Sequence, residues 1–345
     1  MPTASLAPRR FNRAGPRERE SRGMYPTVTL LICTSGRAAQ LDRCLAAITA
    51  GSDLPEQLVV VNGEDAETPG VVERLSAGFR ETVLVRHPNC NLATLRNIGT
   101  PLCTGDIVAM TDDDAIPARD WVSALRSAHA THPQAGAVGG PVRSASDGFA
   151  SRVADVVVFP SPRPNRPIYT LPTVNMSYRR TVMEEIGEFD ESLFRGEDVD
   201  FNWRLLKAGY EIVFEPGMKV QHEHRRSLRG LYQQQWMYGR AYFLVRSKWP
   251  EMYSVYPHSL RSARSWAKLS HAGVAIVYQP WGVSRLMSSP SDRLKAYPVL
   301  VLHHLVWKLG MARQALLRSR AKNFRIPAQV ELEVRRWTAG EPETP

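Results

Sequence analysis

The stretch "DIVAMTDDDAIP", residues 106–117, runs from an apolar, β-forming segment straight into three carboxylates, Asp112 to Asp114. Carboxylates this close raise one another's pKa and destabilise the fold unless a cation or strong donors meet them. A bound metal ion would supply that cation. An Asp-rich turn ahead of a helix that starts near Pro117 is the alternative, because helix N-termini also stabilise acids. The segment therefore predicts a buried strand that ends in either an ion site or a capped turn.

Strand and helix patterns alternate on both sides of this segment. Apolar residues recur at helical spacing in 41–48 and 71–75, between short β-forming runs. The runs are "TVTLLIC" (27–33), "QLVVVNG" (57–63) and "TVLVRH" (82–87). This alternation predicts parallel strands joined by right-handed crossovers, hence a doubly wound α/β sheet. Ligands bind beyond the carboxyl ends of such strands, so we expect Thr34, Asn62 and the three acids to share one crevice.

The bulk composition predicts a globular enzyme. The chain has 345 residues, of which 43% are hydrophobic and 23% charged. The four cysteines, at 33, 44, 90 and 103, lack Cys-x-x-Cys spacing, which favours reduced core thiols in a cytosolic protein. The sequence contains no apolar run of about 18 residues, so it predicts no transmembrane span. Residues 1–24 are basic, lack the apolar core of a signal peptide, and are expected to form a disordered leader.

Positive charge gathers in the last third of the chain. From Arg240 onward there are 17 Lys and Arg against 6 Asp and Glu, a net charge of +11 against +10 for the whole protein. Such a region can bind nucleic acid, an anionic membrane or an acidic substrate. We therefore divide the chain into the leader, a catalytic domain over 25–235 and a basic helical region over 236–345. Within that region, 297–317 predicts an amphipathic helix that lies on a membrane or packs on the catalytic domain.

A Pro-rich stretch, residues 143–172, shows little periodicity. It predicts a long ordered loop or sheet edge that faces substrate, or a plain surface connection.

A second acidic group occurs in "FRGEDVDFNWRLLKAGY", residues 194–210. Gly196 precedes Glu197 and Asp198, and an apolar stripe through Phe201 and Leu205 predicts that a helix begins here. Acids in the first turn are stabilised as anions by exposed N–H groups. Asp198 is thus either a capping residue or, paired with the ion site, a general base for metal-assisted transfer.

Six motifs in sequence resemble the family 2 glycosyltransferases, inverting enzymes with the GT-A nucleotide-sugar fold. The similar part covers roughly residues 26–242. The motifs are "TVTLLICTSGR", "LVVVNGED", "NLATLRNIGTPLCTGDIVAMTDDDAIP", "NMSYRR", "GEFDESLFRGEDVDFNWRLLKAGY" and "VQHEH". The resemblance implies a Rossmann-like α/β central sheet flanked by helices, followed by the basic helical C-terminal region.

The resemblance also implies roles for individual residues. Asp112 and Asp114 match the Asp-x-Asp motif that holds Mn²⁺ or Mg²⁺ on the donor diphosphate, and His222 matches a further metal ligand of some relatives. Asp198 would be the general base, with Glu197 orienting either Asp198 or the acceptor. The implied donor-binding residues are Cys33, Thr34, Arg37, Asn62, Glu64, Arg96, Asn97, Asp112 and Asp113. The implied acceptor-side residues are Asn175, Arg179 and Trp203.

Two of these implied positions leave alternatives open. Asn62 stands where relatives usually carry an acid that receives the nucleotide base, so the identity of the base is not fixed by the motif. Arg96 would contact donor phosphates or pair with an acid to hold its loop.

The function implied is metal-dependent, inverting transfer of one sugar from a UDP-, GDP- or dTDP-linked donor. The acceptor would be a hydroxyl of a glycan, a lipid-linked molecule or a small molecule, in the biosynthesis of cell-surface glycan, polysaccharide or glycoconjugate. We expect a cytoplasmic location, with peripheral contact at the membrane face as an option, and no nucleic-acid partner. The segment "YQQQWMYGRAYF" (232–243) is faintly similar to the Gln-Trp box of processive synthases, but it lacks the arginine before the tryptophan and is interpreted as helix packing.

Two rival functions remain open. A nucleotidyltransferase also combines an α/β sheet with acids and Mg²⁺, although "CTSGRAAQ" is a poor phosphate loop. A non-catalytic module that docks on nucleic acid or membrane through the basic region is the other.

Overall fold

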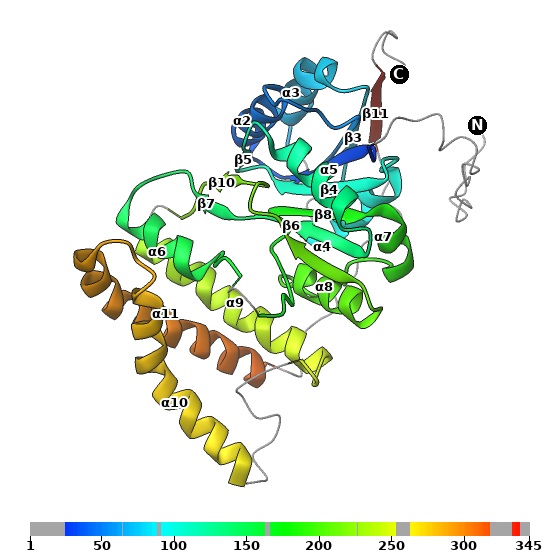
Figure 1. The fold of residues 1–345 in the computed structure, drawn as a ribbon. Helices are drawn as coiled ribbons and strands as arrows, with labels where there is room; N and C mark the ends of the chain where they lie inside the picture. Colours follow the sequence, from blue (N-terminus) through cyan, green and yellow to red (C-terminus); the bar gives the residue numbers. More distant parts are fainter. Residues whose placement is uncertain are drawn as a thin grey trace.

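The computed structural model describes residues 25–63, 65–87, 91–162, 166–225, 227–252, 263–317 and 333–338. Its centre is an eight-stranded sheet with the order β11-β3-β2-β1-β4-β8-β6-β9 (Figure 1). The four strands expected from the sequence are present and parallel. They are β1 (Val28–Thr34), β2 (Gln57–Asn62), β3 (Glu81–Arg86) and β4 (Ile107–Asp112).

The other half of the sheet is mixed, which the alternation alone does not predict. Strand β8 runs antiparallel to both β4 and β6, whereas β9 runs parallel to β6. A strand near the C-terminus, β11, pairs antiparallel with β3 at the sheet edge, so the C-terminal region is not wholly helical. These strands are β6 (Ala135–Gly139), β8 (Asn175–Arg179), β9 (Glu211–Phe214) and β11 (Glu333–Thr338).

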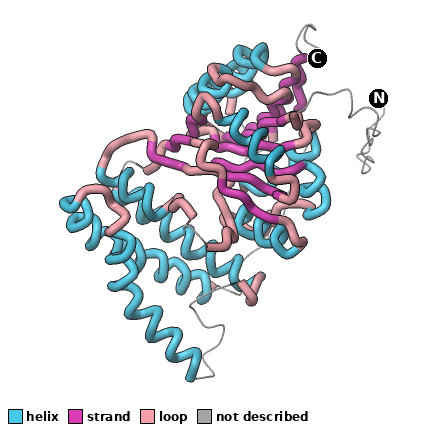
Figure 2. Tube along the Cα trace, in the orientation of Figure 1, coloured by secondary structure: helices cyan, strands magenta, loops and turns pink. Residues whose placement is uncertain are grey.

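Helices cover both faces of the sheet (Figure 2). Successive residues of β1 point to opposite faces, so Leu30 joins the core beneath α2 and α5, and Leu31 joins the core beneath α4, α7 and α8. The helices are α2 (Ala38–Thr49), α3 (Thr68–Leu75), α4 (Leu92–Gly99), α5 (Trp121–Thr131), α7 (Arg180–Ile186) and α8 (Glu197–Lys207). Short 3₁₀ turns follow α3 and α4, at Ser76–Gly78 and Thr100–Leu102.

A small second sheet lies beside the carboxyl end of β4. It contains β5 (Ala115–Pro117), β10 (Val220–His222) and β7 (Val142–Ser144), in the order β5-β10-β7. The antiparallel pairing of β10 with β5 sets His222 opposite Ala115, the residue after the acidic cluster. The Pro-rich stretch 143–172 begins in this sheet and contains a helix, α6 (Phe149–Val157), that the sequence pattern did not indicate.

Three helices follow the sheet domain: α9 (Leu228–Lys248), α10 (Ala263–Ser284) and α11 (Pro290–Leu316). Helix α11 packs along α9, and α10 packs on α11. The α9–α11 crossing is close because Gly239 and Gly310 each lie against the backbone of the other helix, where a Cβ would clash with a tryptophan carbonyl oxygen. The domain boundary expected between residues 235 and 236 falls inside α9 and coincides with no break in that helix.

The predicted helix over 297–317 lies within α11. Its buried residues include Leu300, His303 and Gly310, so one face of it packs against the rest of the protein. Among the described helices, none is both long enough and apolar enough to cross a membrane.

The register of the parallel strands brings the predicted strand ends together. Thr34 lies opposite Asn62, and Cys33 lies opposite Asp112. The carboxyl ends of β1, β2 and β4 therefore meet at one edge, as expected. Cys33, Cys44 and Cys103 are in no disulfide, whereas Cys90 and the predicted leader, 1–24, lie outside the described residues.

Candidate active site

A cavity of about 370 Å³ opens at the carboxyl ends of β1 and β4. Strand ends form one wall, and the N-terminus of α8 with part of α9 forms the other. Most of the predicted site residues line it together: Cys33, Thr34, Arg37, Arg96, Asp112, Asp113, Asp114, Glu197, Asp198 and His222. The cavity thus joins two acidic clusters that are far apart in sequence. We name them the strand-end cluster (Asp112, Asp113 and Asp114) and the helix-start cluster (Glu197, Asp198 and Asp200).

In the strand-end cluster, two of the three carboxylates share one cation. The Arg37 guanidinium donates from the same nitrogen to Asp113 Oδ1 at 2.9 Å and to Asp114 Oδ2 at 2.8 Å. Thr34 donates to the other oxygen of Asp113 at 2.7 Å. Burial raises the pKa of Asp113 to about 6, although Arg37 and Thr34 oppose the rise. Burial also raises the pKa of Asp112, against the charge of Arg96.

Asp114 differs because His222 approaches it from β10. Burial would raise the pKa of Asp114, but the contact with His222 and the charge of Arg37 more than offset it, so the pKa lies below its usual range. His222 Nε2 is 3.1 Å from Asp114 Oδ1. The contact is close but does not have hydrogen-bond geometry, so this buried oxygen has no hydrogen-bond partner among the described residues.

These three side chains fit a divalent cation. Asp112, Asp114 and His222 each offer one ligand atom, and the three atoms lie within 4.8 Å of one another. Side chains that bind a common ion direct their lone pairs at it and not at other protein groups. A buried carboxylate oxygen without a hydrogen bond, close to an imidazole nitrogen, fits such an arrangement. Carboxylate oxygens and imidazole nitrogen suit Mn²⁺, and carboxylates also suit Mg²⁺. The geometry therefore agrees with the interpretation that a bound cation offsets the repulsion among the three acids.

The helix-start cluster begins at a glycine. Gly196 adopts a left-handed conformation with φ of 81°, and helix α8 starts at the next residue. Glu197 is buried and accepts a hydrogen bond from Arg96 at 2.5 Å. Arg96 also donates to Thr173 Oγ1 at 2.6 Å. Arg96 therefore pairs with an acid, which is one of the two alternatives that the sequence left open, and it also lines the cavity. Its contact with donor phosphates stays a prediction.

Asp198 faces the cavity with few polar partners. Its Oδ1 accepts the backbone N–H of Val199 at 2.8 Å. Burial, and next the negative charge of Glu197, raise the pKa of Asp198 to about 6, while Arg96 acts in the opposite direction. A carboxylate with such a pKa is ionised at neutral pH and is a stronger base than a solvated aspartate.

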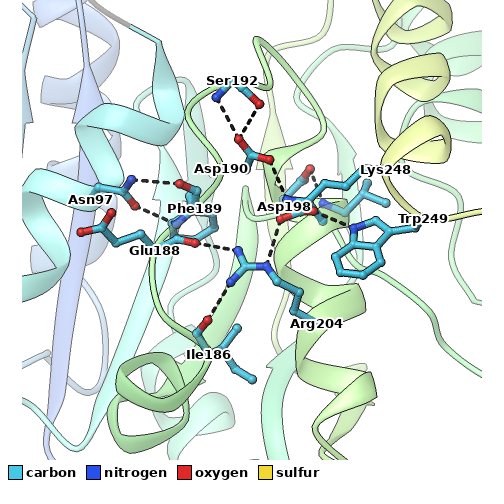
Figure 3. Close-up of polar contacts among 12 residues, drawn as sticks. Asn97, Ile186, Glu188, Phe189, Asp190, Ser192, Asp198, Arg204, Lys248 and Trp249 are labelled. Atoms are coloured by element: carbon cyan, nitrogen blue, oxygen red, sulfur yellow. Dashed lines mark hydrogen bonds and ion pairs between the residues drawn. The ribbon is translucent and has the colours of Figure 1, made fainter. Parts of the chain in front are cut away.

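The third acid of this cluster, Asp200, holds the helix in place, and Figure 3 shows its partners Arg204, Lys248 and Trp249. Asp200 is fully buried and accepts hydrogen bonds from Arg204 Nε at 3.0 Å and Trp249 Nε1 at 2.7 Å. Lys248 Nζ lies 2.7 Å from Asp200 and 2.6 Å from Asp190. These contacts tie the first turn of α8 to the end of α9 and to the loop before α8, so they fix where Asp198 sits.

Two predicted donor-binding residues do not line the cavity. The amide of Asn62 is fully buried and is engaged within its own loop, where it donates to Asp65 O at 2.7 Å and accepts from Asp65 N at 3.2 Å. Asn97 exchanges hydrogen bonds with the backbone of Phe189 and donates to Glu191 Oε1. Both amides hold loops, so the predicted contacts with the base and phosphates are not supported. Glu64 lies outside the described residues.

The three predicted acceptor-side residues also lie away from the cavity. Asn175 is fully buried and bonds Trp121 Nε1, Pro141 O and Met218 O. Arg179 donates to backbone carbonyls around α5 and β6. Trp203 is half-buried, and its ring centroid is 6.2 Å from that of Tyr169. None of the three lines the cavity, so their role on the acceptor side stays a prediction.

Several cavity residues were not anticipated. Gln234 and Tyr238 come from α9, within the segment interpreted as helix packing, and Gln234 Nε2 donates to the Tyr238 hydroxyl at 3.1 Å. Arg195 lies beside them, with its guanidinium carbon 5.7 Å from the Tyr238 ring centroid. Their signal was the four-residue spacing of the two polar residues, which places them on one face of a helix. Phe159, from the Pro-rich stretch, also lines the cavity and is in edge contact with the His222 ring at 5.3 Å.

Known proteins are similar to this chain in sequence or in fold. The pre-mycofactocin glycosyltransferase of Mycobacterium tuberculosis is 26% identical over 232 residues, which cover 63% of this chain but only 46% of that protein. The succinoglycan biosynthesis protein ExoM of Rhizobium meliloti is 32% identical over 228 residues, 61% of this chain and 72% of that protein. A solved structure, the mannosyltransferase PcManGT from Pyrobaculum calidifontis in complex with GDP-Man and Mn²⁺, matches with a TM-score of 0.55 and 19% identity, covering 86% of this chain and 88% of that one.

These matches confirm the predicted GT-A type of α/β fold, with its central sheet flanked by helices. The sequence pattern described as "Glycosyltransferase like family 2" matches residues 26–239, which include every residue that lines the cavity. The chain therefore belongs to the glycosyltransferase family 2.

Proposed function

We propose that this protein transfers one sugar from a nucleotide-sugar donor to a hydroxyl of an acceptor, with inversion at the anomeric carbon and with a divalent cation. One observation carries the proposal: a single cavity presents a three-ligand cation site on one side and a carboxylate with a raised pKa on the other. A metal site beside a separate base is the equipment that a single in-line displacement requires.

The strand-end cluster would bind the donor. Asp112, Asp114 and His222 would hold Mn²⁺ or Mg²⁺, which when bound would offset the charge of the diphosphate leaving group. Arg37 keeps Asp113 and Asp114 in place, and Thr34 fixes Asp113 from the other side. The positive charges of Arg37 and Arg96 at the cavity wall also favour the binding of an anionic diphosphate.

The helix-start cluster would carry out the chemistry on the acceptor. Asp198 takes the proton of the acceptor hydroxyl as that oxygen bonds to the anomeric carbon, and the bond from this carbon to the nucleoside diphosphate breaks. The displacement occurs in one step from the face opposite the leaving group, so the configuration inverts. Glu197 is held by Arg96 and therefore positions the turn that carries Asp198.

The products distinguish this reaction from its nearest rival. A glycosyltransferase releases a nucleoside diphosphate, whereas a nucleotidyltransferase releases pyrophosphate. The solved neighbour binds GDP-Man and Mn²⁺, and the two relatives are named as a glycosyltransferase and as a succinoglycan biosynthesis protein. Donors linked to GDP, UDP and dTDP are therefore the first to test. The acceptor would be a glycan, a lipid-linked molecule or a small glycoconjugate precursor.

The test is a thermal-shift screen of the three nucleotides and their sugars with and without Mn²⁺, followed by product analysis. A donor at ~100 times its dissociation constant should stabilise the protein by about 2.7 kcal/mol. We expect one donor to raise the melting temperature in a Mn²⁺-dependent way and to yield nucleoside diphosphate. Release of pyrophosphate, or no response to any nucleotide sugar, would overturn the proposal.

A further inference from the structure

The outermost helix, α10, presents an apolar face that the described residues leave uncovered. It packs mainly on α11, and Figure 1 shows it at the end of the molecule farthest from β11. Trp266 is 55% exposed, Val274 65% and Trp281 58%. Val277 and Tyr278 on the same helix are exposed as well. At 100° per residue these five side chains fall within an arc of about 120°, a continuous stripe along the helix.

The charges around this stripe have one sign. Lys268 is exposed on α10, outside the apolar arc, and Arg285 is exposed directly after the end of this helix. Arg293 and Lys295 are exposed where α11 begins. Between residues 263 and 317 the sequence contains a single acid, Asp292, whose carboxylate is paired with Arg152 of α6 at 3.0 Å. The charged residues of this part of the chain are therefore almost all cations. An apolar stripe with cations nearby is complementary to a lipid layer whose interior is apolar and whose surface is anionic.

We propose that the α10 face, defined by Trp266, Val274, Val277, Tyr278 and Trp281, docks the enzyme on an anionic lipid surface, with Lys268 and Arg285 as nearby cations. Exposed tryptophan and tyrosine prefer the interface between headgroups and acyl chains, and Lys and Arg side chains reach the anionic headgroups. The helix lies along the membrane, since no described helix has the length and apolarity to cross it. This surface differs from the amphipathic segment expected over 297–317, whose inner face is occupied by contacts within the protein.

A second copy of the chain is the competing occupant. Two copies meeting through this face would bring two positively charged regions together, because residues 263–317 contain a single acid, Asp292, which is already paired with Arg152. Charged groups are depleted from the cores of such interfaces. A lipid headgroup layer supplies the missing anions, so the charge pattern favours membrane.

The experiment is sedimentation of the full chain with vesicles. Binding to phosphatidylcholine vesicles that contain phosphatidylglycerol should be strong, should weaken as salt is added, and should be weak with phosphatidylcholine alone. The double variant Trp266→Ser/Trp281→Ser should lose binding by about tenfold or more, and Lys268→Glu/Arg285→Glu should lose it to a similar degree. A matched charge control, Arg80→Glu/Lys219→Glu, changes exposed cations elsewhere and should bind as the native protein does.

Melting temperatures verify that each variant is folded. The readout needs no sugar transfer, so failure here and failure of the proposed reaction are separate results. The proposal is overturned if the native chain does not sediment with anionic vesicles at low salt, or if the control loses as much binding as the α10 variants. It is also overturned if the tryptophan variant converts a dimer to a monomer in analytical ultracentrifugation while vesicle binding is unchanged, because the face would then join two copies.

Discussion

The two acidic clusters on the cavity are stabilised in opposite ways. In the strand-end cluster, Asp113 and Asp114 share a single guanidinium, and a buried oxygen of Asp114 is left without a hydrogen bond. In the helix-start cluster, Glu197 and Asp200 each have cations of their own. The negative charge of the strand-end cluster is therefore only partly offset by protein cations, which suits an added cation. In the helix-start cluster, Glu197 and Asp200 are paired, and Asp198 is left available as a base.

The difference explains how one cavity can lie between two acidic clusters. A metal ligand must keep lone pairs directed at the ion, so hydrogen bonds from the protein would compete with it. A general base must keep an accessible oxygen with a pKa near the working pH, which requires burial without a tight ion pair. The following predictions test this division of labour.

The largest effect is expected from Asp198→Asn. Removal of the proton acceptor should slow transfer by about 10²- to 10⁴-fold, whereas donor affinity in Mn²⁺ should stay near native because it depends on the other cluster. Steady-state kinetics and calorimetric donor titration measure the two quantities. Asn bonds the N–H of Val199 as Asp does, so the melting temperature should change little.

Asp200→Asn is the matched control on the same helix. It removes a charge that pairs with Lys248 and Arg204, so it should destabilise the fold by about 1.5–3 kcal/mol and leave donor affinity intact. Native turnover by Asp198→Asn, or a stability loss as large as that of Asp200→Asn, would contradict the assigned roles.

The second test concerns the buried pair in the helix-start cluster. Arg96→Ala leaves Glu197 charged and buried, so the free energy of unfolding should fall by about 3–5 kcal/mol. Urea denaturation followed by fluorescence measures it. Lys207→Ala removes one partner of an exposed ion pair with Glu251 and should cost at most about 1 kcal/mol. Equal losses of unfolding free energy in the two variants would mean that the buried pair of Arg96 and Glu197 stabilises the fold no more than an exposed ion pair does.

The third test addresses the strand-end cluster. Asp114→Ala removes one expected ligand and should weaken Mn²⁺-dependent donor binding by at least the ~10- to 100-fold typical of disturbed metal sites. Isothermal titration with and without Mn²⁺ provides the measurement, and EDTA should reproduce the effect on the native protein. Glu223→Ala changes a cavity acid outside the ligand group and should bind donor normally. Full activity in excess EDTA would rule out a cation requirement.

The sequence predicted the features that depend on local pattern. Four apolar runs gave β1 to β4, and the strand ends in turn predicted the neighbourhood of Thr34 and Asp112, because the carboxyl ends of parallel strands meet. The Gly-Glu-Asp sequence predicted the start of α8 correctly at Glu197. The positions of the two acidic clusters within their motifs were therefore enough to predict that both belong to one site.

What the sequence could not predict depends on long-range pairing or on the partner that a polar side chain selects. The amide of Asn62 can bond a nucleotide base or its own loop with equal chemistry, and only the folded loop shows that Asp65 takes it. His222 reaches Asp114 because β10 pairs with β5, a contact that no local period encodes. Tyr238 lines the cavity because α9 turns its polar face there, and hydrophobic spacing alone predicts only that a helix forms.

The smallest effect is a pH dependence, and it separates the two clusters once more. Each contains a carboxyl with a pKa of about 6, Asp113 at the strand end and Asp198 at the helix start. A base must be deprotonated, so kcat/KM should rise with pH by up to about tenfold per unit below 6 and level off above it. If Asp198 is the group whose titration causes this rise in kcat/KM, the Asp113→Asn variant should show the same midpoint. The substitution removes the other titrating group, and the amide oxygen still accepts a hydrogen bond from the Thr34 hydroxyl. Rates measured from about pH 5 to about pH 8 in native and Asp113→Asn protein decide the matter. A flat native profile, or loss of the rise in Asp113→Asn, would shift the titrating group out of the helix-start cluster and leave the raised pKa of Asp198 without a catalytic consequence.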